Sequence, residues 1–479
     1  MNEPQFASIQ SRRRFLREAA GGMGLFALGD LLTADGLTAA STARTDPLAP
    51  RKAHFPGKAK SVIFLFMEGA PSQIDLYDPK PALQKWHGKP APESIVKQLQ
   101  LAFTKPNAAV LASPRVFTPH GDCGTVFSDY IPHIASRADD ICLIRSMHTE
   151  AFNHHPGQLL LMTGSTQFGR PTVGAWTLYG LGSESRDLPG FVVLTSGVGT
   201  SGGATNFASG FLPSVYQGTL FRNQGEPILY LSNPPGISAE TQRRGLDALR
   251  DLNQQHHDDT GDAEIASRIA SYELAFRMQM AAPELLDFSK ESPETLAMYG
   301  VNQETTRPYA TNCLLARRLV ERGVRFVTLM HASWDDHVQL NRKLKKNCDI
   351  TDQPVGALLK DLKQRGLLDS TLVIWAGEFG RTPICEIRNS QEADNAGRDH
   401  HPNCFSLWMA GGGIQGGRVI GATDELGFFI TEDKVHVHDL QATVLHCLGF
   451  DHTRLTYRHM GREFRLTDVG GTVVKKMLA

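Results

Sequence analysis

Short, mostly apolar runs recur along this chain and constrain its fold more than any other feature of the sequence. They lie at residues 61–67, 141–147, 191–194, 324–330, 371–376 and 405–409. Runs of this length without polar alternation are typical of strands buried on both faces of a parallel sheet. Segments of helical periodicity alternate with them, at residues 264–280, 312–322, 351–364 and 439–448. This alternation predicts an α/β fold, a three-layer α/β/α sandwich with a mostly parallel central sheet.

Acidic and histidine side chains follow four of these apolar runs. In open α/β sheets, ligands bind beyond the carboxyl ends of the strands, and carboxylates and imidazoles are the groups that hold divalent metals. The sequence therefore predicts a metal site at one edge of the sheet. The alternative is that the acids cap helices and the histidines make structural hydrogen bonds. The residues concerned are Glu68, Ser72, Asp75, His148, His154, His155, Asp335, His337, Glu378, Asp399, His400 and His401.

Local spacing limits how these side chains can act together. Asp335 and His337 share a side only in an extended or turn segment, so we expect them to chelate outside a helix. His400 and His401 are adjacent and should point apart, which leaves one as a ready ligand and the other as a supporting group. Arg381 has two interpretations. Its planar guanidinium could hold a tetrahedral oxyanion, as could that of Arg398, or it could pair with Glu378 as a structural salt bridge.

The N-terminus predicts export. Residues 11–17, Ser-Arg-Arg-Arg-Phe-Leu-Arg, match the twin-arginine pattern, and a mildly apolar stretch follows at 19–32. We expect residues 1–43 to be a signal peptide read by the twin-arginine translocase, residues 44–57 a flexible leader, and the mature protein periplasmic or secreted. An ordinary amphipathic basic helix is the alternative.

We expect residues 58–479 to form one domain. The formal net charge of the whole chain is −1, so no basic surplus favours nucleic acid as a partner. No run approaches the length of a membrane span. The stretch around 195–240, rich in Gly, Ser and Asn in its first part, predicts a long irregular insertion of the kind that covers or lines a site.

Several passages resemble the alkaline phosphatase/sulfatase superfamily and, within it, a twin-arginine-exported family known as a domain of unknown function. The resemblance runs from about residue 60 to the end of the chain. It implies an alkaline-phosphatase-like sandwich and a metal-dependent hydrolase. The matching passages are Gly69–Asp75 with Asp78–Pro81, Gly210–Ser214 with Tyr216–Gly218, Trp334–His337, Gly377–Pro383, Gly397–His400 and Gly461–Asp468.

The chain departs from the sulfatase pattern at two places. Sulfatases carry their nucleophile in a Cys/Ser-x-Pro-x-Arg motif, and the corresponding run here has His154 at the nucleophile position and Gln158 at the arginine position. The second departure is Phe379, which stands after Glu378 where the superfamily typically has Asp-His-Gly. The resemblance implies that His400 or His401 compensates for this missing histidine.

The sequence thus predicts an exported hydrolase of phosphate or sulfate esters that uses one or two divalent ions, Zn or Ca/Mg. His154 would be nucleophile or general acid/base, Arg381 would bind the oxyanion, and Ser72 would be a ligand, a nucleophile or a helix cap. An alternative is a degenerate envelope or extracellular protein that binds sulfated or phosphorylated glycans; another is a phosphomutase-like transfer. The expected metal ligands or near neighbours are Asp335, His337, Glu378, Asp399, His400, Asp75 and Glu68.

Overall fold

The computed structural model describes residues 46–99, 105, 107–197, 201–222, 228, 231–386 and 395–479. Within these ranges the central element is a nine-stranded sheet, in which a path of eight strands runs β12-β4-β11-β8-β1-β7-β5-β6 and β15 pairs with β4. All six apolar runs form strands of this sheet. The bounds are β1 Ser61–Glu68, β4 Ile141–His148, β5 Phe191–Ser196, β6 Thr219–Phe221, β7 Phe326–Ala332, β8 Thr371–Ala376, β11 Phe405–Ala410, β12 Arg418–Ile420 and β15 Val435–His436.

The sheet is mostly parallel, as predicted. β1 pairs in parallel with both β7 and β8, and β5 pairs in parallel with β6 and β7. β11 is the exception, because it runs antiparallel to β4 and to β8. An apolar run shows that a strand is buried and does not show its direction, so this exception was not visible in the sequence.

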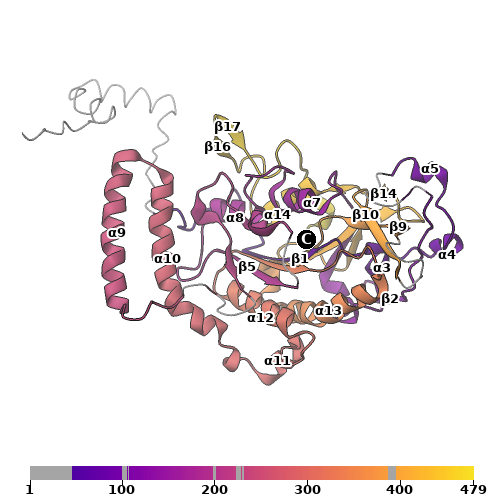
Figure 1. The fold of residues 1–479 in the computed structure, drawn as a ribbon, viewed down its shortest axis with the longest axis horizontal. Coiled ribbons are helices and arrows are strands. Elements are labelled where there is room, and N and C mark those ends of the chain that lie inside the picture. The colour runs from indigo at the N-terminus through magenta and orange to yellow at the C-terminus, as the bar shows by residue number, and fades with distance from the viewer. Residues whose placement is uncertain are drawn as a thin grey trace, which may run out of the picture. The chain divides into compact units, whose positions relative to one another are not determined.

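Helices cover both faces of the sheet and complete the predicted three layers (Figure 1). α12 (Arg307–Glu321) and α13 (Leu340–Gln364) pack on one face, and α7 (His154–Thr163), α8 (Val173–Leu181) and α14 (Val437–Cys447) pack on the other. β1 shows why its sequence lacks polar alternation. Its side chains alternate between two separate hydrophobic cores, with Ile63, Leu65 and Met67 in one and Val62, Phe64 and Phe66 in the other.

The other elements surround this sandwich. α9 and α10 form an antiparallel helical pair that the apolar pattern predicted only for α10, and α13 begins at Leu340 rather than at residue 351. The further helices are α3 Gln73–Leu76, α4 Leu83–Trp86, α5 Glu93–Val96, α6 Pro132–Ala135, α9 Ala239–Thr260, α10 Ala263–Leu286 and α11 Pro293–Tyr299. Four small two-stranded sheets are β2 Phe117–His120 with β3 Thr125–Ser128, β9 Gly380–Glu386 with β10 Gly397–His401, β13 Ala422–Thr423 with β14 Ile430–Glu432, and β16 Tyr457–His459 with β17 Arg462–Phe464.

The predicted signal peptide, residues 1–43, lies outside the described residues. Part of the segment expected to be a flexible leader is anchored instead. The backbone N–H of Arg51 donates to the Leu181 carbonyl at 2.7 Å, and its guanidinium donates to the Tyr216 hydroxyl at 2.9 Å. These bonds satisfy polar groups that a flexible segment would leave to water. Of the helices in the described ranges, none combines the length and apolar character that a membrane crossing requires.

Candidate metal centre

The loops that follow β1 and β7 meet at one edge of the sheet. The two strands are in register to their ends, where Glu68 lies opposite Ala332. Gly69 has φ +110°, and a Cβ added there would collide with the backbone nitrogen of Asp335. Only glycine allows this close approach of the two loops. The approach places Asp335 directly beside the end of β1.

Four side chains from three separate segments converge at this edge. His154 begins α7, Asp335 and His337 follow β7 outside any helix as predicted, and His400 lies on β10. One donor atom from each lies within 4.8 Å of the other three. Asp335 Oδ1 is 3.1 Å from His154 Nε2, 2.9 Å from His337 Nε2 and 3.7 Å from His400 Nε2. The Nε2 atoms of His337 and His400 are 3.0 Å apart.

The opposite nitrogen of each imidazole contacts an oxygen acceptor. The Nδ1 atoms of His154 and His337 lie 2.6 Å from a Glu378 oxygen and 2.5 Å from a Glu386 oxygen. His400 Nδ1 lies 2.7 Å from the carbonyl oxygen of Phe152. Because these oxygens accept, Nδ1 carries the proton in each neutral ring, and Nε2 keeps a lone pair directed at the centre. Histidines that bind metals are usually oriented in this way.

These spacings fit a small divalent cation. Ligand bonds of about 2.0–2.2 Å in a tetrahedral zinc site place the donor atoms roughly 3.3–3.6 Å apart. The separations of 2.9–3.7 Å measured here lie around that value. Facing lone pairs on imidazoles repel one another unless a proton or a cation lies between them. The donor set of three nitrogens and one oxygen therefore suits a borderline ion such as zinc.

One member of the group opens the centre to solvent. The side chain of Asp335 is 48% exposed, whereas His337 and His400 are buried. Arg381 is fully buried behind it and donates to Asp335 Oδ1 at 2.6 Å. The same guanidinium also donates to the carbonyls of Gly69, Ala70 and Arg398. Arg381 therefore fixes the carboxylate from behind and leaves the exposed side to a ligand; it does not pair with Glu378.

The charges of the group are strongly coupled. Burial alone would lower the pKa of His154, but hydrogen bonds to Asp335 and Glu378 outweigh it and raise that pKa to about 9. Burial alone would raise the pKa of Asp335, but bonds from the three histidines and the charge of Arg381 hold it well below its usual range. Burial lowers the pKa of His400, which keeps that ring neutral near pH 7. A proton and a divalent cation thus compete for the same nitrogen of His154.

Two of the predicted ligands lie outside the four-residue group and contact its members. Glu378 is fully buried and accepts from the backbone N–H of Gly69, at 3.1 and 3.2 Å, as well as contacting His154. Asp399 belongs with His337 and Glu386 to a second group of potential ligand atoms within 4.8 Å, and it accepts from its neighbour's backbone, the His400 N–H, at 2.8 Å. The second group shares the His337 ring with the first, so it lies against the same histidine and is not a separate centre.

The structure places three other predicted residues away from the four-residue group. Asp75 is buried against Arg398, whose Nε lies 2.8 Å from its carboxylate, and it accepts from the Ser72 hydroxyl at 2.5 Å. This bond occupies the Ser72 hydroxyl, which caps no helix. Burial would raise the pKa of Asp75, but the charge of Arg398 lowers it. Glu68 instead accepts from the Ser201 N–H at 2.5 Å, and burial raises its pKa.

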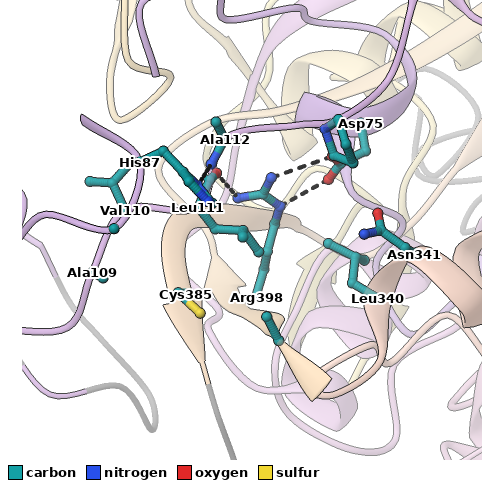
Figure 2. Close-up of a pocket in the computed structure, with 13 residues that line it drawn as sticks. Asp75, His87, Ala109, Val110, Leu111, Ala112, Leu340, Asn341, Cys385 and Arg398 are labelled. Carbon is teal, nitrogen blue, oxygen red and sulfur yellow. Dashed lines mark hydrogen bonds and ion pairs between the residues drawn. The ribbon is translucent and has the colours of Figure 1, made fainter. Parts of the chain in front are cut away.

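The Asp75–Arg398 pair borders a pocket of about 420 Å³ whose lining includes none of the four residues of the group (Figure 2). Figure 2 shows the Arg398 guanidinium bonded to Asp75 and to the backbone of the segment around Leu111. Apolar side chains and backbone make up most of the wall. They come from Ala109, Val110, Leu111, Ala112, Pro114, Leu340 and Ala396.

Two contacts of the centre were not predicted from the sequence. Glu386, which orients His337, ends β9 with no motif around it, and the Phe152 carbonyl that orients His400 belongs to the backbone. The replacement of the expected histidine by Phe379 is explained, because that ring packs against His154 and His400 at centroid distances of 5.1 and 4.6 Å. His400 joins the group, while His401 contacts the Gly427 carbonyl at 3.2 Å.

A family model described as "Protein of unknown function (DUF1501)" matches residues 59–478, and the chain therefore belongs to this family. No curated protein matches the chain. Among solved structures, it is similar to the alkaline phosphatase from the Antarctic bacterium TAB5, with 10% identity, 75% of this chain and 92% of that chain covered, and a TM-score of 0.29. It is also similar to the PsFucS1 sulfatase from Pseudoalteromonas sp., with 11% identity, 84% and 68% covered, and a TM-score of 0.35. A protein in the alkaline phosphatase superfamily from Vibrio parahaemolyticus is similar at 11% identity, with 84% and 70% covered and a TM-score of 0.33.

Proposed function

Taking membership of this family as the starting point, we propose that the chain is a metal-dependent hydrolase of phosphate or sulfate esters. The orientation of the three imidazoles is the observation that carries the proposal. Each Nδ1 contacts an oxygen acceptor, and each Nε2 converges on Asp335 Oδ1. The Nδ1 contacts hold the three rings with Nε2 facing one shared point, which is the usual orientation of histidines that bind a metal.

The donor set supports one ion, zinc in preference to calcium or magnesium, because calcium and magnesium prefer ligand sets made of oxygen. Such an ion supplies Lewis acidity, which polarises an ester oxygen and lowers the pKa of water. Asp335 and the three histidines would hold it. Glu378 and Glu386 would keep the rings of His154 and His337 in position, and Arg381 would balance the charge of Asp335.

The geometry favours attack by water over a covalent intermediate. His154 stands at the position of the sulfatase nucleophile, but one of its nitrogens contacts Glu378 and the other faces the centre. The hydroxyl of Ser72 donates to Asp75. Among the described residues of the centre, this leaves neither a hydroxyl nor a thiol as the attacking group. We therefore assign His154 as a ligand, in place of the nucleophile role considered from the sequence.

The ester class and the location rest on sequence motifs. The passages that resemble the alkaline phosphatase/sulfatase superfamily include the two segments that carry Asp335 and His400. The twin-arginine pattern at residues 11–17 supports export to the periplasm or beyond. Because that translocase carries folded proteins, the metal would be acquired before export.

Metal analysis and ester turnover test this proposal together. Protein purified without chelators should contain about one equivalent of zinc, and it should hydrolyse 4-nitrophenyl phosphate or 4-nitrophenyl sulfate. Dialysis against a chelator should abolish turnover, and added zinc should restore it. Met280→Ala, a change at a side chain that is 79% exposed on α10, is a matched control that should leave metal and turnover unchanged. Folded protein that neither binds a divalent metal nor turns over either ester would refute the proposal.

A second candidate is a protein that binds sulfated or phosphorylated glycans without hydrolysing them. The lack of a serine or cysteine at the nucleophile position favours it. The wild-type protein and His154→Ala separate the two candidates. If the protein is a hydrolase, turnover collapses in the variant. If it only binds, wild-type protein loaded with metal retains a sulfated oligosaccharide without product, and the variant still binds the glycan.

A further inference from the structure

The loop between α7 and α8 carries an exposed aromatic ring. Phe168 is 65% exposed, and it is the only phenylalanine among the described residues with a solvent-exposed side chain. Leaving a phenyl ring in water forgoes about 1.5–3 kcal/mol of burial. The two hydrophobic cores of the sandwich do not include it. A bound molecule is one reason for a protein to maintain such a ring on its surface.

A ring contact links Phe168 to the segment that carries His154. Its ring meets the ring of His155 edge to face, with centroids 5.1 Å apart and an interplanar angle of 81°. His155 directly follows His154, and neighbouring Cα atoms are about 3.8 Å apart. His155 Nε2 is buried and has no hydrogen-bond partner among the described residues.

The segment that precedes Phe168 is held by its own contacts. α7 ends at Thr163 and is capped by Gly164, where a Cβ would collide with the Leu466 carbonyl oxygen. The Ser165 carbonyl accepts from the Thr163 hydroxyl at 3.1 Å, and the Ser165 hydroxyl accepts from the Gln167 N–H at 3.2 Å. These contacts order the N-terminal flank of the loop, which reduces the entropy lost when a ligand stacks on the ring.

We propose that Phe168 and His155 form a subsite for the alcohol portion of the ester, and that this portion is a ring with a flat apolar face. The inference rests on the proposed function, because it places the ring next to the group that the metal centre binds. A phenyl ring and the apolar face of a pyranose share this chemistry. Stacking on an aromatic ring accepts both, whereas a short alkyl group gains little from it.

Binding of phosphonates to the zinc-loaded protein tests the subsite without turnover. The probes are methylphosphonate, phenylphosphonate and glucosylmethylphosphonate, measured by calorimetry. In the wild type, at least one ring compound should bind about three- to tenfold more tightly than methylphosphonate. Phenylphosphonate alone would indicate an aryl ester, and the glucosyl compound alone would indicate a sugar ester.

Variants at position 168 separate stacking from simple hydrophobic contact. Phe168→Ala and Phe168→Leu should both lose the ring preference, because leucine keeps the apolar volume but not the flat face. Phe168→Tyr should retain it. Methylphosphonate affinity and zinc content should stay unchanged in all three variants and in Met280→Ala.

The outcomes distinguish this inference from the proposed function. If zinc and methylphosphonate bind but neither ring compound binds more tightly, the subsite is refuted and the hydrolase proposal stands. A ring preference that survives in Phe168→Ala also refutes it. Folded protein that binds neither zinc nor any phosphonate refutes the proposed function, and the subsite falls with it.

Discussion

The β9–β10 hairpin contributes to two kinds of charged cluster. In the first, the Nε2 atoms of His337 and His400 face Asp335, and that carboxylate is half exposed. In the second, Asp75 and Arg398 are fully buried and pair with each other, and the Ser72 hydroxyl and the Leu111 carbonyl complete the set. Both clusters consist of residue types found at strand ends. What separates them is exposure and composition, because the first gathers imidazole nitrogens around a half-exposed carboxylate and the second is a buried pair of opposite charges.

The largest expected effect comes from removing a histidine of the open cluster. His337→Ala deletes a central donor and leaves Glu386 without the imidazole that it contacts. We expect zinc affinity to fall by more than about 100-fold, beyond the usual loss for a supporting residue, with turnover abolished. Competition with a chromophoric chelator measures the zinc affinity. Zinc bound at wild-type affinity would show that the cluster is not the metal centre.

Breaking the closed cluster should affect folding and spare the metal. Arg398→Ala leaves the Asp75 carboxylate buried without its cation, which costs about 3–5 kcal/mol of unfolding free energy. Urea denaturation measures this, and zinc per folded molecule should remain near the wild-type value. The double variant Asp75→Leu with Arg398→Met should recover much of the stability, because an apolar pair can replace a buried ion pair. Loss of zinc from folded Arg398→Ala would show that the metal ligands depend on the Asp75–Arg398 pair, so that the two clusters act together.

Glu386 sharpens the comparison, since it was not predicted and contacts the Nδ1 side of His337, away from the centre. Glu386→Gln keeps the size and one oxygen but removes the charge beside His337 Nδ1. Zinc affinity should fall by about 10- to 100-fold, the usual range for such supporting residues. Glu240→Gln, a change at an exposed ion pair with Arg244, should leave zinc affinity unchanged. Equal zinc binding by Glu386→Gln and the wild type would show that the charge of Glu386 does not contribute to metal affinity.

The smallest expected effect, about tenfold for a change of one pH unit, is the pH dependence of zinc binding. His154 has a pKa raised to about 9, so its ring is protonated at neutral pH and must lose that proton to bind metal. Zinc affinity should therefore rise about tenfold per pH unit up to about pH 9 and level off above it. Titrations in matched buffers between pH 6 and pH 10 measure the slope. A flat profile would mean that His154 is not a ligand.

The sequence predicted the sandwich well because burial leaves a strong mark on composition. All six apolar runs became strands, and Asp335, His337 and His400, three of the expected ligands, converge with His154. The roles of other residues depended on geometry that spacing does not encode. Glu378 is within reach of His154 Nδ1 only because β8 ends beside α7, and Asp75 turns from the centre toward Arg398. Tertiary packing decides which way each of these side chains points, and residue type alone does not specify it.

The close contact of Gly69 with the backbone of Asp335 has a consequence for redesign. A side chain at position 69 would push the two loops apart, and the carbonyl that accepts from Arg381 and the N–H that donates to Glu378 would move with the backbone. The main chain therefore sets the spacing of the loops that carry the candidate metal ligands. A designer who seeks a different metal should vary the donors at 154, 335, 337 and 400, and keep glycine 69 in every library.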